Sequence, residues 1–137
     1  MQASPRTTQL QGWGIAVLRI VAGYLFLVSG VEKVFSGTST PFGISISLPL
    51  PISVALMLTE VLGGVALILG LLTRWVSVPL AFLMLADILV VHPPNALLED
   101  QEYGYALIRL AASVTLVLTG SGKVALDNVL AIRRGAK

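Results

Sequence analysis

Four long apolar runs divide this chain, and short, more polar segments separate them. The runs span approximately residues 13–35, 52–72, 75–91 and 104–120. Each has about the 17 to 25 residues that an α-helix needs to cross the hydrocarbon core of a bilayer. Continuous runs of this kind do not fit a transmembrane β-barrel, whose short segments alternate between apolar and polar residues. The pattern predicts an all-α membrane protein, a bundle of four transmembrane helices.

Composition extends this assignment to the whole chain. Of the 137 residues, 55% are hydrophobic and 12% are charged, and the mean hydropathy is +0.89. We therefore expect one transmembrane domain over residues 1–137, ending in a short basic tail at 121–137. The first run contains Arg19 and is longer than the apolar centre of a signal peptide, which has about 7 to 15 residues. We expect it to be a retained helix.

A scarcity of metal-binding residues narrows the possible chemistry. The chain has no cysteine, which excludes thiolate metal sites, cysteine-ligated iron–sulfur clusters and cysteine nucleophiles. The single histidine, His92, excludes a haem held by two histidines of this chain. We expect no metal or haem bound by this chain alone, and the sequence identifies no catalytic residue.

Basic residues predict the orientation of the chain. They occur before the first run, between the second and third, and after the fourth, namely Arg6, Arg74, Lys123, Arg133, Arg134 and Lys137. Four spans place these segments on one side, which the positive-inside rule makes cytoplasmic. We expect both termini in the cytoplasm and a multi-pass inner-membrane protein. In the first opposite connection, "ISISL" fits either a solvated loop or a short strip on the membrane surface.

Every run contains an ionisable residue away from its ends: Arg19, Glu60, Asp87 and Arg109. Charges in hydrocarbon are unfavourable, so these residues should face the interior and pair. Asp87, Arg109 and Glu60 lie about 7, 8 and 12 Å below the outer ends of their helices, with side chains leaning towards one another. We predict a buried cluster in which Arg109 bridges both carboxylates. Arg19 lies deeper, and we expect it to reach the inner headgroups.

Two interpretations of this cluster stay open. The charges could simply lock the helices in register, as polar side chains often do in membranes. Alternatively, two carboxylates facing one guanidinium leave one acid without a full counter-charge, which makes it a candidate for proton exchange or for holding a polar ligand. Glu60 is the first candidate because it is the deeper acid.

Small residues indicate where helices approach each other. The first helix carries a stripe at helical spacing, made of Arg19, Gly23, Phe26, Gly30 and Lys33, and the second a stripe of Ser53, Glu60, Gly64 and Leu67. Glycines let backbones come close in a membrane. We expect these two helices to be neighbours, with packing glycines at Gly23, Gly30, Gly63 and Gly64.

Further candidates for contacting a ligand or partner are Arg19, Ser29, Lys33, His92 and Tyr105. His92 follows Asp87 by five residues, about 140° around the helix axis, so the two do not share a face. His92 either caps the end of the third helix, before two prolines, or acts as a pH-sensitive or ligand-contacting group near an acidic loop. Tyr105 is expected at the outer interface, where aromatic anchors occur.

Four segments together resemble a known family: "LRIVAGYLFLVSGVEKVF", "TEVLGGVALILGLLTR", "VVHPPN" and "LTGSGKVALD". Their order and spacing are similar to those of the DoxX family of small four-helix bacterial membrane proteins, whose relatives include the membrane subunit of thiosulfate:quinone oxidoreductase. The chain departs from this pattern at Ser29, where many members have histidine. It departs again at Asp87 and Arg109, where apolar residues are expected, so these two look like a mutually compensating pair.

The resemblance implies a redox-associated inner-membrane protein. We expect a subunit or scaffold of a quinone-linked or oxidative-stress complex, more a non-catalytic subunit than an enzyme; a catalytic role would be that of a quinone-linked oxidoreductase component. Quinone is the candidate cofactor. The expected partners are the lipid bilayer, other redox proteins or membrane subunits, and further copies of the chain, but not nucleic acid. A small-solute or proton-coupled transporter and a purely structural assembly factor stay open as alternatives.

Overall fold

The computed structural model describes residues 5–35, 50–90, 101–122 and 125–126. These residues form four helices and no strand: α1 (Pro5–Phe35), α2 (Leu50–Leu69), α3 (Thr73–Val90) and α4 (Gln101–Thr119). The all-α prediction is confirmed. The helices pack as neighbours in the cyclic order α1, α2, α3, α4, with the closest association between α1 and α2 and between α3 and α4.

Most helix boundaries differ by a few residues from the ends of the apolar runs, and the start of α1 and the end of α2 show the causes. Helix α1 begins at Pro5 instead of near residue 13, because a helix can continue through polar residues beyond its apolar part and proline suits a first helical position. Helix α2 ends at Leu69, where Gly70 (φ 71°) and Leu72 (φ 46°) turn the chain. Gly70 N–H donates to Leu67 O at 3.1 Å, which closes the helix. The apolar residues of this turn conceal it in the hydrophobic pattern.

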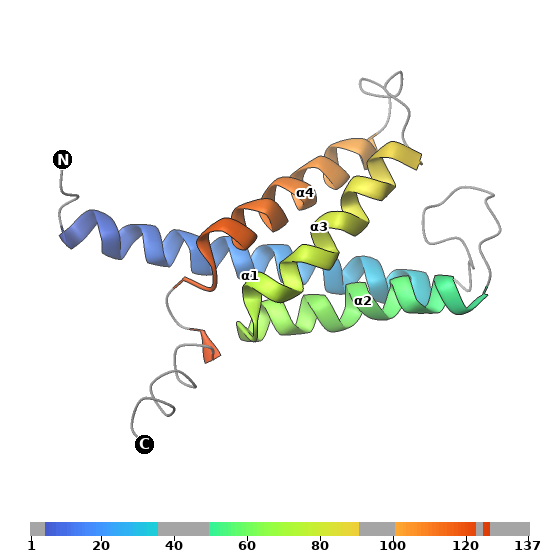
Figure 1. Ribbon diagram of the computed structural model, residues 1–137, viewed down its shortest axis with the longest axis horizontal. Helices are drawn as coiled ribbons and strands as arrows, with labels where there is room; N and C mark the ends of the chain where they lie inside the picture. Colours follow the sequence, from blue (N-terminus) through green and yellow to red (C-terminus); the bar gives the residue numbers. More distant parts are fainter. Residues whose placement is uncertain (1–4, 36–49, 91–100, 123–124, 127–137) are drawn as a thin grey trace.

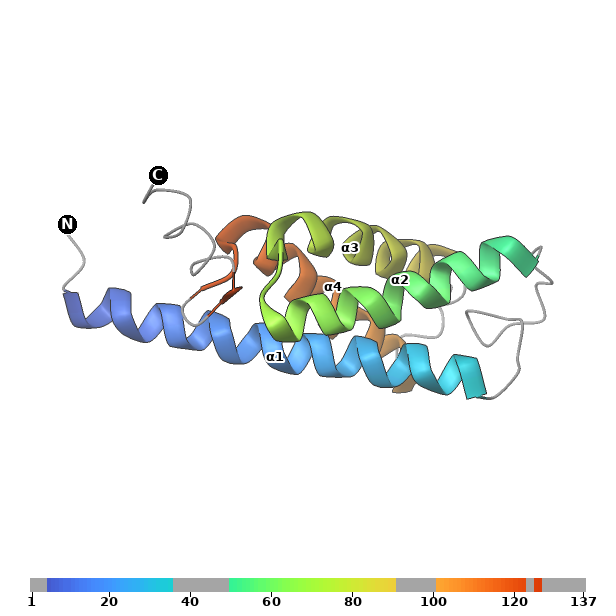
Figure 2. The same ribbon diagram turned by 90° about the horizontal axis from the view of Figure 1, so that it is seen from below.

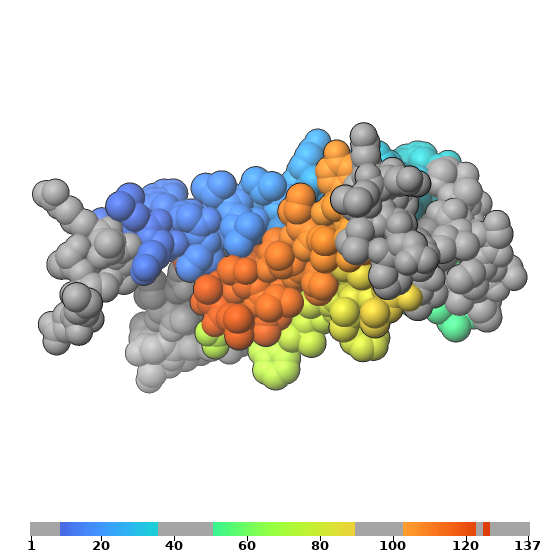
Figure 3. Space-filling view, turned by 90° about the horizontal axis from the view of Figure 1, so that it is seen from above, coloured from blue at the N-terminus to red at the C-terminus, as the bar shows by residue number. Residues whose placement is uncertain are grey.

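Helix ends that are far apart in the sequence lie towards the same end of the molecule. Figure 1 shows the start of α1, the α2–α3 link and the end of α4 towards one end of the molecule. Figure 2 shows α1 and α2 running side by side, while the first part of α1 extends beyond α3 and α4 in Figure 3. Fully buried apolar side chains from all four helices form the core of the bundle, namely Phe26, Leu67, Leu80, Met84 and Leu116.

Large apolar side chains also cover the outside of the described helices. Two of these helices contain segments long and apolar enough to cross a membrane, Gln9–Phe35 and Pro51–Leu69, and Tyr103–Thr119 is a shorter apolar helix. Only 33% and 28% of the most apolar windows in the two long segments are buried. A core helix of a soluble protein would be mostly buried, whereas outward-facing apolar surface of this extent suits contact with lipid.

Glycines set the spacing between α2 and its neighbours. A Cβ added at Gly23 would lie 2.8 Å from Gly64 O, and one at Gly64 would lie 2.7 Å from Gly23 O, so the α1 and α2 backbones touch here. Gly30 approaches Val61 in the same interface, and Gly63 instead faces Leu80 of α3. Because α1 and α2 are antiparallel, this tight contact aligns the polar residues that follow it on α1 with those that precede it on α2.

Candidate functional site

A buried ion pair joins α1 to α2. Lys33 Nζ donates to both carboxylate oxygens of Glu60, at 2.7 and 2.8 Å. The Glu60 side chain is 1% exposed and that of Lys33 is 21% exposed. Gly30, one turn before Lys33, makes the approach possible, because a Cβ there would lie 3.2 Å from Glu60 Cβ. Helical side chains lean towards their own N-terminus, so on these antiparallel helices the two side chains converge.

Arg109 brings α4 against the same part of α1. Its Nη1 donates to Ser29 Oγ at 3.1 Å, and its guanidinium carbon lies 6.0 Å from the centre of the Phe26 ring. Phe26, Ser29 and Lys33 share one face of α1 because they are three or four residues apart. Arg109 Nε is buried and has no hydrogen-bond partner among the described residues. One N–H group of the guanidinium is therefore left to donate to a further acceptor.

Asp87 of α3 completes the set of charges. Both Asp87 and Arg109 are close enough to Glu60 to act on it electrostatically. We use "charge site" for Ser29, Lys33, Glu60, Asp87 and Arg109, to which all four helices contribute. The bridging of both carboxylates by Arg109 stays a prediction, but Lys33 changes the charge balance assumed from the sequence. Two cations now accompany two carboxylates, so Glu60 does not lack a counter-charge.

The predicted position of Arg19 is wrong. Its side chain is 1% exposed and does not reach the headgroups. Instead, Arg19 Nη1 donates to Ser121 O at 2.7 Å and packs against Gly70, where a Cβ would lie 2.5 Å from Nη1. The chain after α4 folds back over α1 and supplies a carbonyl oxygen in place of the predicted headgroups. Arg19 thus ties α1 to the end of α4 and to the α2–α3 link.

We expect Arg19→Met to lower the free energy of unfolding in detergent by about 1–3 kcal/mol, because the partly buried Ser121 carbonyl loses a charged donor. The matched control is Arg74→Gln, which removes an exposed arginine that also donates to a carbonyl, Leu118 O at 3.1 Å. Its expected loss is below about 1 kcal/mol. Thermal unfolding followed by circular dichroism measures both, and equal losses would contradict the distinction between buried and exposed arginines.

Two further residues were predicted to contact a ligand or partner, Tyr105 and His92. Tyr105 is exposed on α4, whereas His92 lies outside the described residues. Within residues 5–35, 50–90, 101–122 and 125–126, no three His, Cys, Asp or Glu side chains gather as a metal ion would require. Lys33 was predicted as a ligand or interface residue, but its pairing with Glu60 was not predicted. The pairing could have been predicted from spacing. Gly30 packs against α2, and Lys33 follows it by three residues, so Lys33 lies on the same face of α1.

Comparisons with known proteins agree with this architecture. The sequence profile of the DoxX family matches residues 14–93, which include Lys33, Glu60 and Asp87. A protein of Bacillus subtilis (strain 168) named "Putative oxidoreductase CatD" is 36% identical over 116 residues, covering 83% of this chain and 84% of that protein. No solved structure matches the chain significantly. Because the profile spans more than half of the chain and the relative most of it, this chain belongs to the DoxX family of membrane proteins.

Proposed function

We propose that the protein is a subunit or scaffold of a membrane redox complex in the inner membrane, with quinone-linked or oxidative-stress chemistry. The name of the Bacillus subtilis relative contains the word oxidoreductase. This chain has no cysteine and one histidine, so its own side chains offer few ligands for redox metals. A partner protein would then carry the redox groups, and the membrane chain would position the partner or a lipid-soluble electron carrier.

The charge site is the observation that carries this proposal. Apolar helices seldom enclose two cations and a buried carboxylate unless those groups have a structural or chemical task. Arg109 Nε is a buried donor without a hydrogen-bond partner among the described residues, and a carbonyl oxygen is an acceptor that would suit it. A lipid-soluble carrier with carbonyl oxygens, such as a quinone, would supply that acceptor. A bound quinone would supply transfer of electrons and protons.

The residues of the charge site have separable tasks under this proposal. Arg109 would hold a carbonyl oxygen through Nε while Ser29 fixes its Nη1. Lys33 and Glu60 already share a hydrogen bond, so the pair can hold a proton near that oxygen. Because Lys33 is partly exposed and Glu60 is not, Lys33 is the member of the pair with access to the surroundings.

We expect Arg109→Gln to reduce the quinone content of the purified complex about tenfold, because a charged hydrogen bond contributes about 1.5–3 kcal/mol. The protein is isolated from native membranes with its partners, and quinone is extracted and quantified by chromatography. The matched control is Glu32→Gln, which alters an exposed charge next to Lys33 on α1. It should leave the quinone content unchanged.

The same purification distinguishes the alternatives. A redox subunit should co-purify with a protein whose spectrum shows flavin or haem absorption. Purification alone as a dimer with ligand- or pH-dependent stability would overturn the proposal in favour of a transporter. Co-purification with a redox enzyme, but with equal quinone in the wild type and Arg109→Gln, would retain the scaffold and overturn the quinone assignment.

A further inference from the structure

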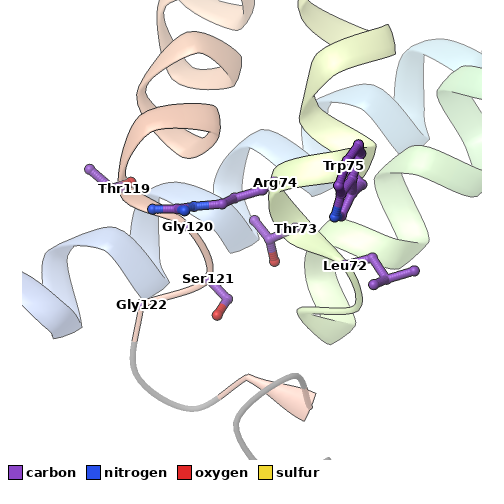
Figure 4. Close-up of a pocket in the computed structure, with 8 residues that line it drawn as sticks. All are labelled: Leu72, Thr73, Arg74, Trp75, Thr119, Gly120, Ser121 and Gly122. Atoms are coloured by element: carbon purple, nitrogen blue, oxygen red, sulfur yellow. The ribbon is translucent and has the colours of Figure 1, made fainter. Parts of the chain in front are cut away.

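A pocket of about 530 Å³ lies where α3 begins and α4 ends. Its walls come from residues 72–75 at the start of α3 and residues 119–122 after α4 (Figure 4). Gly120 and Gly122 have φ angles of 85° and 66°, so the chain turns away from the axis of α4 and leaves space between the two segments. None of the wall residues belongs to the charge site, so the proposed function does not use this pocket.

The pocket has a cationic character. Arg74 is exposed, donates to Leu118 O at 3.1 Å and has further N–H groups to donate. Figure 4 shows its side chain extending from α3 towards Thr119 and Gly120. Ser121 O, which would otherwise repel an anion, accepts a hydrogen bond from Arg19. The described residues of the walls include no Asp or Glu, and the N-terminus of α3 adds the positive end of its helix dipole.

An apolar surface continues from one wall of the pocket along α3. Trp75 is 78% exposed, and Val78 and Phe82 are also exposed. These residues follow one another at intervals of three and four, so they lie on one face of the helix. Tryptophan is enriched where hydrocarbon meets headgroups. The cationic pocket and the apolar stripe therefore meet at Trp75, as the two parts of a lipid molecule do.

We propose that this pocket binds the phosphate headgroup of an acidic phospholipid, whose acyl chain lies along Trp75, Val78 and Phe82. The phosphate accepts hydrogen bonds from Arg74 and is attracted by the α3 N-terminus. A free phosphate anion would use the same cationic groups but would leave the apolar stripe uncovered. The stripe thus favours a lipid as the source of the phosphate. Among the described wall residues Arg74 is a cation and none is an acid, which favours an acidic lipid over one whose headgroup adds a positive charge.

Fluorescence quenching tests this assignment on the full chain in detergent. Trp13 and Trp75 are the two tryptophans, so Trp13→Phe leaves Trp75 as the only tryptophan, which excitation at the red edge of the indole band selects over tyrosine. Brominated phosphatidylglycerol should quench Trp75 saturably, with an affinity about fivefold higher than that of brominated phosphatidylcholine, since one arginine at the membrane surface contributes about that factor. Adding Arg74→Gln should abolish this preference. Arg6→Gln, which removes the same charge from the first turn of α1, should retain it.

A second substitution tests the pocket without removing Arg74. Ser121→Glu places a carboxylate in the wall and should abolish the preference for phosphatidylglycerol, whereas the uncharged Ser121→Gln should keep it. Equal quenching by the two lipids in the wild type, or an unchanged preference in Ser121→Glu, overturns the proposal. Displacement of brominated phosphatidylglycerol by millimolar inorganic phosphate would also overturn it, because the site would then take the free anion. Unlabelled phosphatidylglycerol should displace the brominated lipid.

Discussion

Replacement of Lys33 by methionine is expected to lower the free energy of unfolding by about 3 kcal/mol, because it leaves the buried carboxylate of Glu60 without its direct counter-charge. Glu60→Gln should have a smaller effect, about 1 kcal/mol. The difference follows from exposure, since Glu60 is 1% exposed whereas Lys33 is 21% exposed and can turn towards water or headgroups. Equilibrium unfolding in mixed detergent micelles measures both variants.

The double variant Lys33→Met/Glu60→Met provides the decisive comparison. Removing both partners of a buried ion pair is often close to neutral, because no uncompensated charge stays behind. We therefore expect it to recover most of the stability lost in Lys33→Met. Glu32→Gln, on the exposed side of α1, is the matched control and should change stability by less than about 0.5 kcal/mol. If Lys33→Met proves as stable as this control, the ion pair does not support the fold.

Helical periodicity predicted which side chains turn inward, because a face repeats every three or four residues whatever lies opposite it. Arg19 and Phe26 on α1, and Glu60 and Leu67 on α2, are all buried as that spacing requires. Periodicity does not reveal the neighbour of a buried residue when it comes from a distant segment. Arg19 illustrates this limit, since its partner is a backbone carbonyl after α4, and a carbonyl leaves no trace in a hydrophobic pattern.

The depth of a residue's backbone in the bundle predicts its charged partner less well than the length of its side chain does. Asp87, Arg109 and Glu60 were grouped because their backbones lie at similar depths, and Lys33 was not part of that group. A long lysine side chain spans about one helical turn, which is enough to bring Nζ to 2.7 Å from Glu60 Oε1. Depth estimated from the backbone therefore misplaces the charge of a long side chain.

Two residues at which the chain departs from the family pattern contact each other in the structure. Ser29 and Arg109 were noted separately, and Arg109 was assigned to Asp87. The structure joins Ser29 and Arg109 by a 3.1 Å hydrogen bond. A small hydroxyl residue at position 29 leaves room for a guanidinium that reaches across from α4. The two departures are thus parts of one contact between α1 and α4.

Gly64→Ala is expected to lower the free energy of unfolding by about 2–3 kcal/mol, the range of a severe overpacking change. The added Cβ would lie 2.7 Å from both Gly23 O and Leu27 N, and backbone atoms cannot rotate away as a side chain does. Helices α1 and α2 would have to separate, one turn from Glu60. Gly14→Ala is the matched control, because a Cβ there meets nothing within 4 Å.

Alanine is a better helix former than glycine by about 1 kcal/mol, so Gly14→Ala should leave stability unchanged or raise it slightly. The two substitutions are chemically identical and both lie inside helices, so opposite signs can come only from the space around each glycine. Thermal unfolding of both variants in one detergent makes the comparison direct. A Gly64→Ala protein as stable as Gly14→Ala would mean that the α1 and α2 backbones do not touch in the folded protein. The alignment of Lys33 with Glu60 would then need another cause.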